Sequence, residues 1–365
     1  MNSELAENLL RKVMGEAAEA DFPEQLGTLR SLALYKYDEY QQYAPGRQFI
    51  ESLALWLVQF AAPEERQHAL GFIRERLVFI SDHEMRHLVT LMARDHIPAV
   101  LQRRVAPVLS LAPYRVAAVR SSAEFRRSRR ASLFLGMSDG ARIDQLRRSS
   151  DGMSNEQFAT NYELSERRAK AMVDELRTYL QDDKAVFQQV FLVDDFAGSG
   201  RTILRHDEGT AIQGRLVRFL QDTLPRLEME ECPKIYLCLY LTTSQALSSL
   251  RELIAAYPDA PWSAGNVPEV VPVMVLDDSS CLRHGRGGVE YEVDLLFDGL
   301  LHKYYDEAVE DEHKGSVVHG FSDCGLSLVL SHNTPNNSVY LLWEKEKTAP
   351  LFPRFERHQG RQKED

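Results

Sequence analysis

Apolar residues recur at helical spacing through the first third of the chain. Between residues 47 and 60 they share one helical face, because they fall three or four positions apart, at Phe49, Leu53, Leu57 and Phe60. Pro23 and Pro63 are each followed by glutamate, a pairing typical of the first helical turn. The pattern continues over residues 82–99. We therefore expect residues 1–115 to form a helical N-terminal region that has no catalytic cluster and serves as an interaction or regulatory layer.

From residue 131 onward, short apolar runs alternate with helical spacing. The runs predict strands at residues 132–136, 190–193, 234–241, 269–276 and 326–330. Helical spacing predicts helices at residues 140–148, 165–180, 213–224 and 244–256. Strands that alternate with helices are joined by crossovers into a parallel sheet. We expect an α/β domain over residues 131–344, with a parallel sheet flanked by helices, and a charged tail at residues 345–365.

Composition places the chain among globular proteins. Of its 365 residues, 44% are hydrophobic and 27% are charged, which is close to the globular average. No run approaches the roughly 18 apolar residues of a membrane span, and residues 1–5 lack the basic and apolar stretches of a leader. The four cysteines show no C-x-x-C spacing. We expect a cytoplasmic protein with reduced thiols and no membrane contact.

Positive charge is concentrated in one segment of an acidic chain. The formal net charge is −11, but residues 101–150 contain eleven arginines and only three acidic residues, a local balance of +8. Such a segment would bind polyphosphate, nucleic acid or an acidic partner. A solvated linker is the alternative interpretation. Residues 116–130 within this segment are the expected arginine-rich connector between the helical region and the α/β domain.

Two adjacent carboxylates follow a buried strand in the middle of the α/β region. Residues 190–193 are all apolar, and Asp194 and Asp195 come next. A central parallel strand has this pattern where it reaches the carboxyl edge of an open α/β sheet. Ligands bind at that edge, so the two acids are candidate ligand-binding residues.

A tight loop of small residues follows the two acids. Gly198 and Gly200 allow a sharp turn that brings backbone N–H groups close to an anion, while Ser199 and Thr202 add hydroxyl donors. A helix that starts near Arg201 would point its positive end at the same place. The simplest such anion is a phosphate. An ordinary strand followed by an acidic, glycine-rich surface turn is the alternative.

The residues from 190 to 202 resemble the phosphoribosyl-pyrophosphate motif of the phosphoribosyltransferases, which has four hydrophobics, two acids, two variable residues and a small-polar-Gly-x-Thr loop. The resemblance implies that Asp194 and Asp195 bind the ribose 2′ and 3′ hydroxyls, often beside Mg²⁺. It also implies that residues 198–202 bind the 5′-phosphate. Arg201 stands where many members have a second glycine, and it would add a charge or alter loop closure. Neither a P-loop nor a G-x-G-x-x-G pattern occurs.

A second loop, residues 137–144, follows the predicted strand at 132–136 and should reach the same edge of the sheet. The resemblance implies a pyrophosphate-binding loop there, with Gly140 and Arg142 at the anion and Ser138 or Asp139 near Mg²⁺. The usual form of that loop is absent. A plain strand-to-helix turn in which Asp139 caps the helix is the alternative.

Polar side chains also crowd the loop at residues 331–338. His332 would act as a general acid or base near neutral pH, and it is a candidate catalytic residue beside Asp194 and Asp195. Asn333 and Asn337 would recognise the edge of a base. The alternative is a hydrogen-bonded turn that links the strand at 326–330 with residues 339–343.

A narrower resemblance rests on five segments. They are residues 135–142, 320–324, 332–337, 341–343 and 350–354. Together they resemble a bacterial group of phosphoribosyltransferase-like proteins found in antiviral conflict systems, including some retrons. This resemblance implies an effector or accessory role in phage defence, with a partner protein on the N-terminal helices. It does not fix the catalytic activity.

The leading hypothesis is an enzyme that acts on a nucleotide or phosphoribosyl pyrophosphate at ribose C1′. Its transition state would carry positive charge on the sugar ring, so the ribose must be fixed and the leaving group neutralised. Phosphoribosyl transfer and cleavage of a nucleotide's glycosidic bond both satisfy these requirements. The alternatives are a non-catalytic nucleotide sensor that signals to a partner, and a nucleic-acid-bound defence subunit that uses the arginine-rich segment.

Overall fold

The computed structural model describes residues 3–15, 21–257, 262, 266–282, 292–307, 317–345 and 348–355. The chain divides into two compact units. Residues 85–276 form one of them, which we call the sheet unit. Residues 1–84 and 277–365 form the other, which we call the helical unit.

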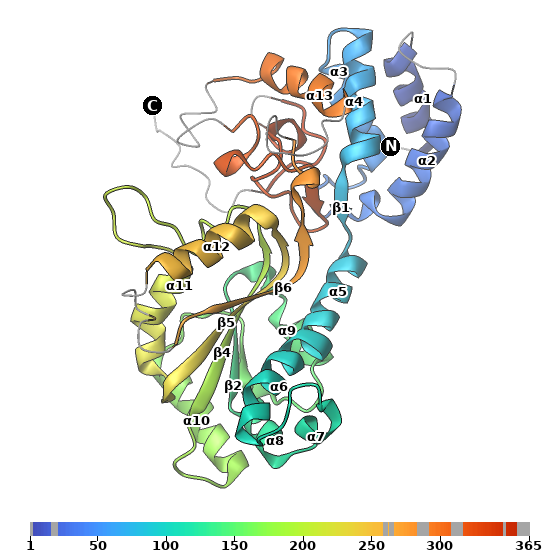
Figure 1. The fold of residues 1–365 in the computed structure, drawn as a ribbon. Helices are drawn as coiled ribbons and strands as arrows, with labels where there is room; N and C mark the ends of the chain where they lie inside the picture. Colours follow the sequence, from blue (N-terminus) through green and yellow to red (C-terminus); the bar gives the residue numbers. More distant parts are fainter. Residues whose placement is uncertain are drawn as a thin grey trace. The chain divides into compact units, whose positions relative to one another are not determined.

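Five parallel strands form the centre of the sheet unit (Figure 1). They are β2 (Ser132–Gly136), β3 (Phe158–Ala159), β4 (Phe187–Ala197), β5 (Met229–Thr243) and β6 (Glu269–Leu276). Their order is β3-β2-β4-β5-β6, and all neighbours are parallel. The chain therefore adds β3 on one side of β2, and β4, β5 and β6 on the other side. The carboxyl ends of β2 and β4 form a topological switch point, where ligands bind in open α/β sheets.

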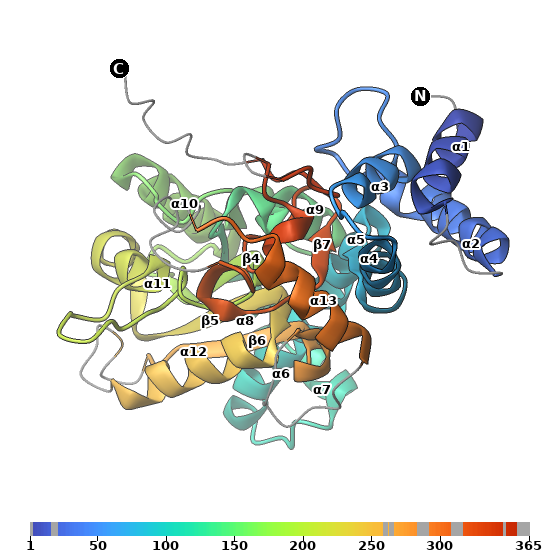
Figure 2. The same ribbon diagram turned by 90° about the horizontal axis from the view of Figure 1, so that it is seen from above.

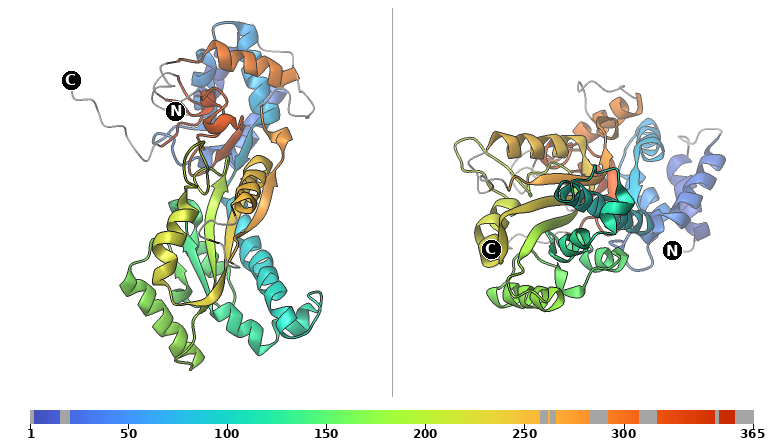
Figure 3. Two further views of the ribbon diagram at one scale, coloured as in Figure 1. Left: turned by 60° about the vertical axis from the view of Figure 1, so that its left-hand side comes forward. Right: turned by 60° about the horizontal axis from the view of Figure 1, so that its bottom comes forward.

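Helices cover both faces of this sheet, and the predicted α/β fold with preceding N-terminal helices is confirmed. The helices of the sheet unit are α6 (Ile97–Val108), α7 (Val116–Arg120), α8 (Ala123–Arg130), α9 (Ile143–Ser149), α10 (Glu166–Leu180), α11 (Arg215–Arg218) and α12 (Ser244–Ala256). Figure 3 shows α10 and α11 on one side of the sheet and α6 and α8 on the other. Figure 2 shows α12 beside β5 and β6.

Alternation along the strands gives each face of the sheet its own packing. On one face, Leu192 of β4 packs in a core with Met172 and Leu176 of α10. The other face carries a row of rings at paired positions, with neighbouring centroids 4.7, 4.8 and 4.9 Å apart: Phe158, Phe134, Phe191 and Tyr236. Burial on both faces explains why these strands are almost continuously apolar in sequence.

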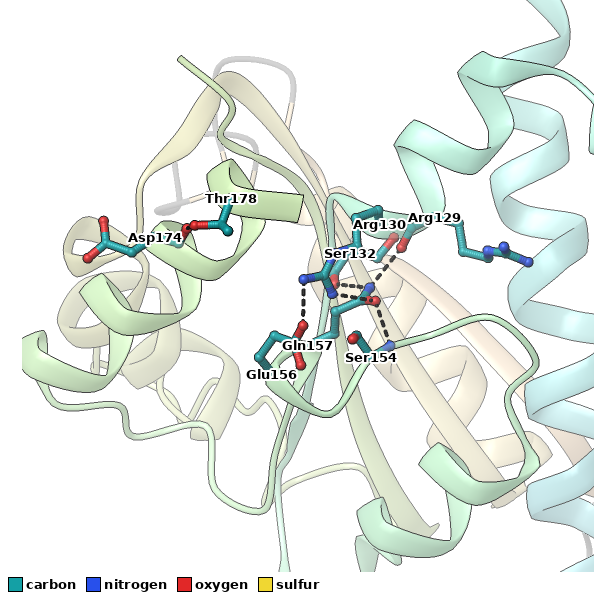
Figure 4. Close-up of polar contacts among 8 residues, drawn as sticks. All are labelled: Arg129, Arg130, Ser132, Ser154, Glu156, Gln157, Asp174 and Thr178. Atoms are coloured by element: carbon teal, nitrogen blue, oxygen red, sulfur yellow. Dashed lines mark hydrogen bonds and ion pairs between the residues drawn. The ribbon is translucent and has the colours of Figure 1, made fainter. Parts of the chain in front are cut away.

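The basic helix α8 is fastened to β2 and to the segment before β3 (Figure 4). The guanidinium of Arg130 contacts Glu156 at 2.6 Å and donates a hydrogen bond to Gln157 at 3.1 Å. The amide nitrogen of Gln157 donates to the carbonyl oxygens of Arg129 and Ser132, at 2.8 and 3.0 Å. Arg130 and Gln157 are both buried. The end of the arginine-rich connector therefore packs on the sheet unit through Arg130, while most of residues 116–130 are exposed.

The helical unit combines both ends of the chain. Its helices and strands are α1 (Ser3–Met14), α2 (Phe22–Tyr35), α3 (Phe49–Val58), α4 (Pro63–Arg76), β1 (Val78–Ile80), α13 (Glu292–Lys303) and β7 (Leu328–Leu330). The helix α5 (Asp82–Leu91) contains the boundary between the units. The rings of Phe72 on α4 and Phe297 on α13 stack at 3.8 Å. The indole of Trp56 on α3 donates to the carbonyl oxygen of Leu341 at 2.8 Å.

These units differ from the predicted segments 1–115, 116–130, 131–344 and 345–365. The strand predicted at 326–330 was assigned to the α/β domain, but β7 pairs with β1 in a separate two-stranded parallel sheet. The physical reason is that the apolar faces of α3 and α4 are completed by residues from the C-terminal part of the chain, such as Phe297 and Phe352. Residues 340–342 form a 3₁₀ helix.

Candidate functional site

Asp194 and Asp195 lie at the carboxyl end of β4, beside the switch point of the sheet. Because side chains alternate along a strand, the two residues leave β4 on opposite faces, although both carboxylates reach the hydroxyl of Ser138. Asp194 shares its face with Leu192, which belongs to the core under α10, while Asp195 shares the aromatic face with Phe191. Both acids are buried, with 3% and 9% of their surface exposed. The strand end thus presents two carboxylates with different neighbours.

Ser138 connects the end of β2 with both acids. Its hydroxyl donates a hydrogen bond to Oδ1 of Asp194 and lies 3.4 Å from Oδ1 of Asp195. The serine follows the turn at the end of β2, where the amide of Met137 donates to the carbonyl oxygen of Val193 on β4 at 2.8 Å. The predicted second loop and the predicted acid pair therefore meet at the switch point, as the parallel strand ends require.

Arg215 is the cationic neighbour of this pair, and the sequence did not single it out. It stands at the first position of α11, and its Nη1 lies 3.2 Å from Oδ2 of Asp194. Burial and the nearby charge of Asp195 raise the pKa of Asp194 to about 7, while the hydrogen bond from Ser138 and the charge of Arg215 act in the opposite direction. Asp194 therefore holds a proton more tightly than an exposed aspartate.

The loop after β2 packs closely against Asp195. A Cβ atom at Gly140 would collide with the carboxylate of Asp195, so only glycine fits there without movement of the acid. Arg142 has a left-handed backbone with φ 46° and ψ 41°, which is an unfavourable conformation for a residue other than glycine. The hydroxyl of the fully buried Tyr240 on β5 donates to the carbonyl oxygen of Ala141 at 2.9 Å. Tyr240, which the sequence analysis missed, thus holds this turn in place.

The predicted alternative for this loop does not match the structure. Asp139 was expected to cap a helix, but it is the exposed first residue of a short 3₁₀ helix, Asp139–Ala141. Ser138 precedes it and uses its hydroxyl on Asp194 instead. The helix expected at residues 140–148 begins at Ile143, as α9. Ser138 and Gly140 therefore contact the acid pair, while Asp139 and Arg142 lie in the same turn.

The glycine loop after β4 is shaped by the neighbouring strand and helix. The hydroxyl of Thr243, at the end of β5, donates to the carbonyl oxygen of Gly198 at 2.6 Å and also caps α12. Gly200 has φ 73°, and a Cβ atom there would lie 3.0 Å from Cγ of Leu250 on α12. Among the residues that the structure describes, none accepts a hydrogen bond from the amide N–H groups of Ser199 and Gly200. These two donors suit an anion such as phosphate.

The helix expected to start near Arg201 is absent from that position. The amides of Ile203 and Leu204 donate back to the carbonyl oxygen of Gly200 at 3.0 and 2.9 Å, which closes a single turn. The chain then continues to an antiparallel bridge between residues 205 and 213. The next helix is α11, which begins at Arg215. A helix dipole at Arg201 therefore cannot assist anion binding.

Arg201 and Thr202, the last two residues of the predicted phosphate loop, are less enclosed than the rest. The guanidinium of Arg201 forms an ion pair with Asp207 and is 42% exposed. The backbone amide nitrogen of Arg201 lies 3.5 Å from the hydroxyl of Ser199. Thr202 is exposed, and its carbonyl oxygen accepts a hydrogen bond from the amide of Arg215 at 3.1 Å. The loop is thereby tied to the start of α11.

The predicted residues His332, Asn333 and Asn337 belong to the helical unit. The amide group of Asn333 makes two hydrogen bonds with the backbone of Phe355, both at 3.0 Å. Asn337 is buried, and its amide nitrogen donates to the carbonyl oxygen of Phe321 at 3.0 Å. These contacts are those of a hydrogen-bonded turn, the alternative interpretation of this loop. The catalytic role of His332 stays a prediction.

Arginines of the basic segment form ion pairs within the sheet unit. These are Arg103 with Glu269, Arg104 with Glu230, Arg127 with Asp182, Arg130 with Glu156, and Arg147 and Arg148 with Asp144. Acidic residues from outside the segment thus neutralise part of its local excess of +8. This pairing weakens the case for a nucleic-acid surface, which needs an uncompensated positive face.

The acid pair has the chemistry that a magnesium site requires. Mg²⁺ prefers carboxylate oxygens and usually keeps several waters. The carboxylates of Asp194 and Asp195 provide hard oxygen ligands at one strand end, and the hydroxyl of Ser138 adds a third oxygen beside them. These residues therefore fit the predicted ion.

Sequence signals for the missed residues differ in strength. Tyr240 lies within the predicted strand 234–241, near its carboxyl end, so its place at the ligand-binding edge follows from strand polarity. Thr243 directly precedes the predicted helix 244–256, in the ordinary position of a helix cap. Arg215 gives no comparable signal, because its contact with Asp194 depends on how the chain returns after residues 205–213.

Comparison with known proteins agrees with this geometry. A family model described as PRTase-CE matches residues 53–354, which include both acids and the whole glycine loop. A search of curated proteins and a search of solved structures found no match. None of the helices in the described ranges is long and apolar enough to cross a membrane. Because the family model covers most of the chain, the protein belongs to PRTase-CE, a phosphoribosyltransferase-like family.

Proposed function

We propose that the protein binds the 5-phosphoribosyl group of a nucleotide or of phosphoribosyl pyrophosphate and breaks its bond at C1′. One observation supports this most: Asp194 and Asp195 end a central strand at the switch point and are followed by a loop with two amide donors. Carboxylates suit the ribose hydroxyls, and the amides of Ser199 and Gly200 suit the 5′-phosphate. The same group would then be held at both ends.

The reaction moves an electron pair from the C1′ bond onto the leaving group, and an acceptor nitrogen or a water molecule forms the new bond. Positive charge develops on the ribose ring during this step. The nearby carboxylate of Asp195 stabilises that charge, and the Ser138–Arg142 turn faces the leaving group. Mg²⁺, when bound by the acids, would supply charge neutralisation for a diphosphate.

The activity is tested by incubating the full chain with a cellular nucleotide pool and Mg²⁺, and by following each nucleotide by mass spectrometry. We expect one class of nucleotide or phosphoribosyl pyrophosphate to be consumed. The Asp194→Asn/Asp195→Asn double variant should lose at least about 100-fold of that rate, in the range expected for removing key transition-state contacts. A double variant that keeps full turnover would overturn the proposal.

A second candidate is a nucleotide sensor without turnover. It is favoured by the contact between Arg215 and Asp194, because an arginine that already neutralises the acid leaves less negative charge for catalysis. In this case the double variant weakens nucleotide affinity, and wild type consumes no nucleotide. Equilibrium binding of each nucleotide beside the turnover assay separates the two candidates.

We also propose that the protein serves as an effector or accessory component in bacterial antiphage defence, with a partner protein on its N-terminal helices. Support for this role comes from the resemblance of residues 135–142 and of four segments between residues 320 and 354 to phosphoribosyltransferase-like proteins of conflict systems. The test is phage plating on bacteria that carry the protein with its neighbouring genes. Protection should disappear in the Asp194→Asn/Asp195→Asn variant, and equal protection by that variant would separate defence from this site.

A further inference from the structure

Three side chains that bind metals well meet in the helical unit, outside the site described above. Asp298 and His302 lie four positions apart on α13, and so on one face of that helix. His319 comes from the segment before a short 3₁₀ helix, Phe321–Asp323. One ligand atom from each of the three residues lies within 4.8 Å of the other two. The sequence analysis did not identify this cluster, because 16 residues separate His302 from His319.

The distances between the individual atoms are close to those of a coordination site. Nε2 of His319 lies 2.6 Å from Oδ1 of Asp298, and Nε2 of His302 lies 3.8 Å from Oδ2 of the same carboxylate. Ligands about 2.1 Å from a tetrahedral zinc ion are about 3.4 Å from each other. Shifts of about 1 Å would therefore suffice. His302 is 60% exposed, so its ring has room to turn.

The second ring nitrogen of His319 is held by another carboxylate. Nδ1 lies 3.1 Å from Oδ1 of Asp323, so a proton on Nδ1 is shared with that acid and Nε2 is directed at Asp298. A metal-binding histidine commonly has such a carboxylate partner, which fixes its tautomer and orientation. Asp323 and its neighbour Ser322 have φ of 50° and 57°, so this turn is held in an unfavourable conformation while it presents the carboxylate.

We propose that Asp298, His302 and His319 bind a divalent transition metal of the zinc class, with Asp323 as the partner that orients His319. Two imidazoles and one carboxylate are a ligand set for zinc and its neighbours in the first transition row, whereas Mg²⁺ and Ca²⁺ prefer oxygen ligands alone. Three protein ligands leave a fourth position for water or for another group.

Metal binding at this site exchanges a proton for the ion. The 2.6 Å contact between His319 and Asp298 is a hydrogen bond that requires a proton between the two atoms. The entering ion takes that place and the proton leaves to the buffer. The ion would tie the end of α13 to the Phe321–Asp323 turn, two segments that the chain joins through residues 304–318. An ion-pair network without metal is the competing interpretation of the same contacts.

The test uses the full chain, with any affinity tag removed and with metals stripped by a chelator. Zn²⁺ is titrated by calorimetry, and Co²⁺ is titrated by visible absorption, which reports nitrogen and oxygen coordination directly. We expect one saturable site for each ion. His319→Gln should weaken that site by about 100-fold or more, because even loss of an orienting partner costs about 10–100-fold. Asp298→Asn should also weaken the binding of both ions.

Two control variants define the outcome. His83→Gln removes an exposed histidine from the same unit, outside the cluster, and should leave the affinity unchanged. Asp194→Asn alters the proposed ribose site and should also leave it unchanged, so failure of one proposal is distinguishable from failure of the other. Circular dichroism checks that each variant folds. Absence of a saturable Co²⁺ spectrum in wild type, or equal affinity in His319→Gln and Asp298→Asn, would show that the cluster is only an ion-pair network.

Discussion

The hydroxyl of Ser138 donates a hydrogen bond to Oδ1 of Asp194, and it thereby joins the ends of β2 and β4 where the strand order reverses. The bond brings the loop after β2 next to the motif acids. An incoming ribose would compete for the same carboxylate. The hydroxyl of Ser138 therefore holds Asp194 in place, and it lies where a ribose hydroxyl would bind this carboxylate.

The pH dependence of stability provides the first prediction. Asp194 has a folded-state pKa of about 7 instead of 3.8, because burial and Asp195 disfavour its charge. The folded state binds the proton of Asp194 more tightly than the unfolded state does, so protonation of Asp194 stabilises the fold. This stabilisation is complete below about pH 4 and is lost as the pH rises through 7. Asp194→Asn, which stays neutral, should raise the Tm at pH 8 by a few degrees, at about 2–4 °C per kcal/mol, and change it little at pH 5.

Thermal unfolding of wild type and variant at both pH values measures this difference. Asp182→Asn is the matched control, because the pKa of this partly exposed acid is lowered by its hydrogen bond to Arg127. Its replacement should not stabilise the protein at pH 8. If Asp194→Asn changes the Tm equally at pH 5 and pH 8, the raised pKa of Asp194 is contradicted.

Gly200 and Gly209 form a matched pair for the glycine loop. Their φ angles are 73° and 74°, but a Cβ atom would lie 3.0 Å from Leu250 at Gly200 and would meet nothing within 4 Å at Gly209. Gly209→Ala should cost about 1 kcal/mol of unfolding free energy, the penalty of the left-handed backbone. Gly200→Ala should cost about 2–3 kcal/mol, because overpacking against α12 is added. Denaturant unfolding compares them, and equal costs would argue against tight packing of the loop on α12.

Gly140→Ala should impair the site more than the fold. The added methyl group would collide with the carboxylate of Asp195, which must then turn away from the ligand position. We expect the rate, or the nucleotide affinity in the sensor case, to fall by about 10–100-fold, the effect of misplacing a group by about 1 Å. Gly27→Ala on α2, where a methyl group meets nothing within 4 Å, is the control and should leave both quantities unchanged. Equal rates, or equal nucleotide affinities, in the two variants would show that Gly140 is not part of the site.

Arg130 and Arg148 should differ sharply as contributors to stability. Arg130 is buried, and its removal takes away the ion pair with Glu156 and one hydrogen-bond donor to Gln157. Arg130→Ala should therefore cost about 3–4 kcal/mol. Arg148 pairs with Asp144 on the surface, where both side chains are more than half exposed, and Arg148→Ala should cost less than about 1 kcal/mol. Denaturant unfolding measures both, and a small effect at Arg130 would mean that α8 is not fastened by this network.

Strand polarity and local spacing predicted much of the site. The apolar run before Asp194 and the glycines after it were sufficient to place the acids at the edge of a parallel sheet. Ser138 and Gly140 followed from the same reasoning, because they come directly after a neighbouring strand. These features depend on residues close together in sequence, and the structure places them next to each other as expected.

The errors arose where long-range packing decides the structure. A helix at Arg201 was reasonable from the loop motif, but Gly200 closes a single turn and α11 begins only at Arg215. The strand near residue 328 has the apolar pattern of a central strand, yet it pairs with β1 from the N-terminal part of the chain. Nothing in its local sequence distinguishes these partners. The cluster of Asp298, His302 and His319 was missed for the same reason.

The central claim is that the strand end and the loop hold a phosphorylated ribose. The most direct test is calorimetric titration of ribose 5-phosphate into wild type, the Asp194→Asn/Asp195→Asn variant and Gly200→Ala, each with Mg²⁺. We predict one site in wild type, and at least about 10-fold weaker binding in both variants, the loss of about 1.4 kcal/mol or more. Equal affinity in all three proteins, with their folds intact, would contradict the account.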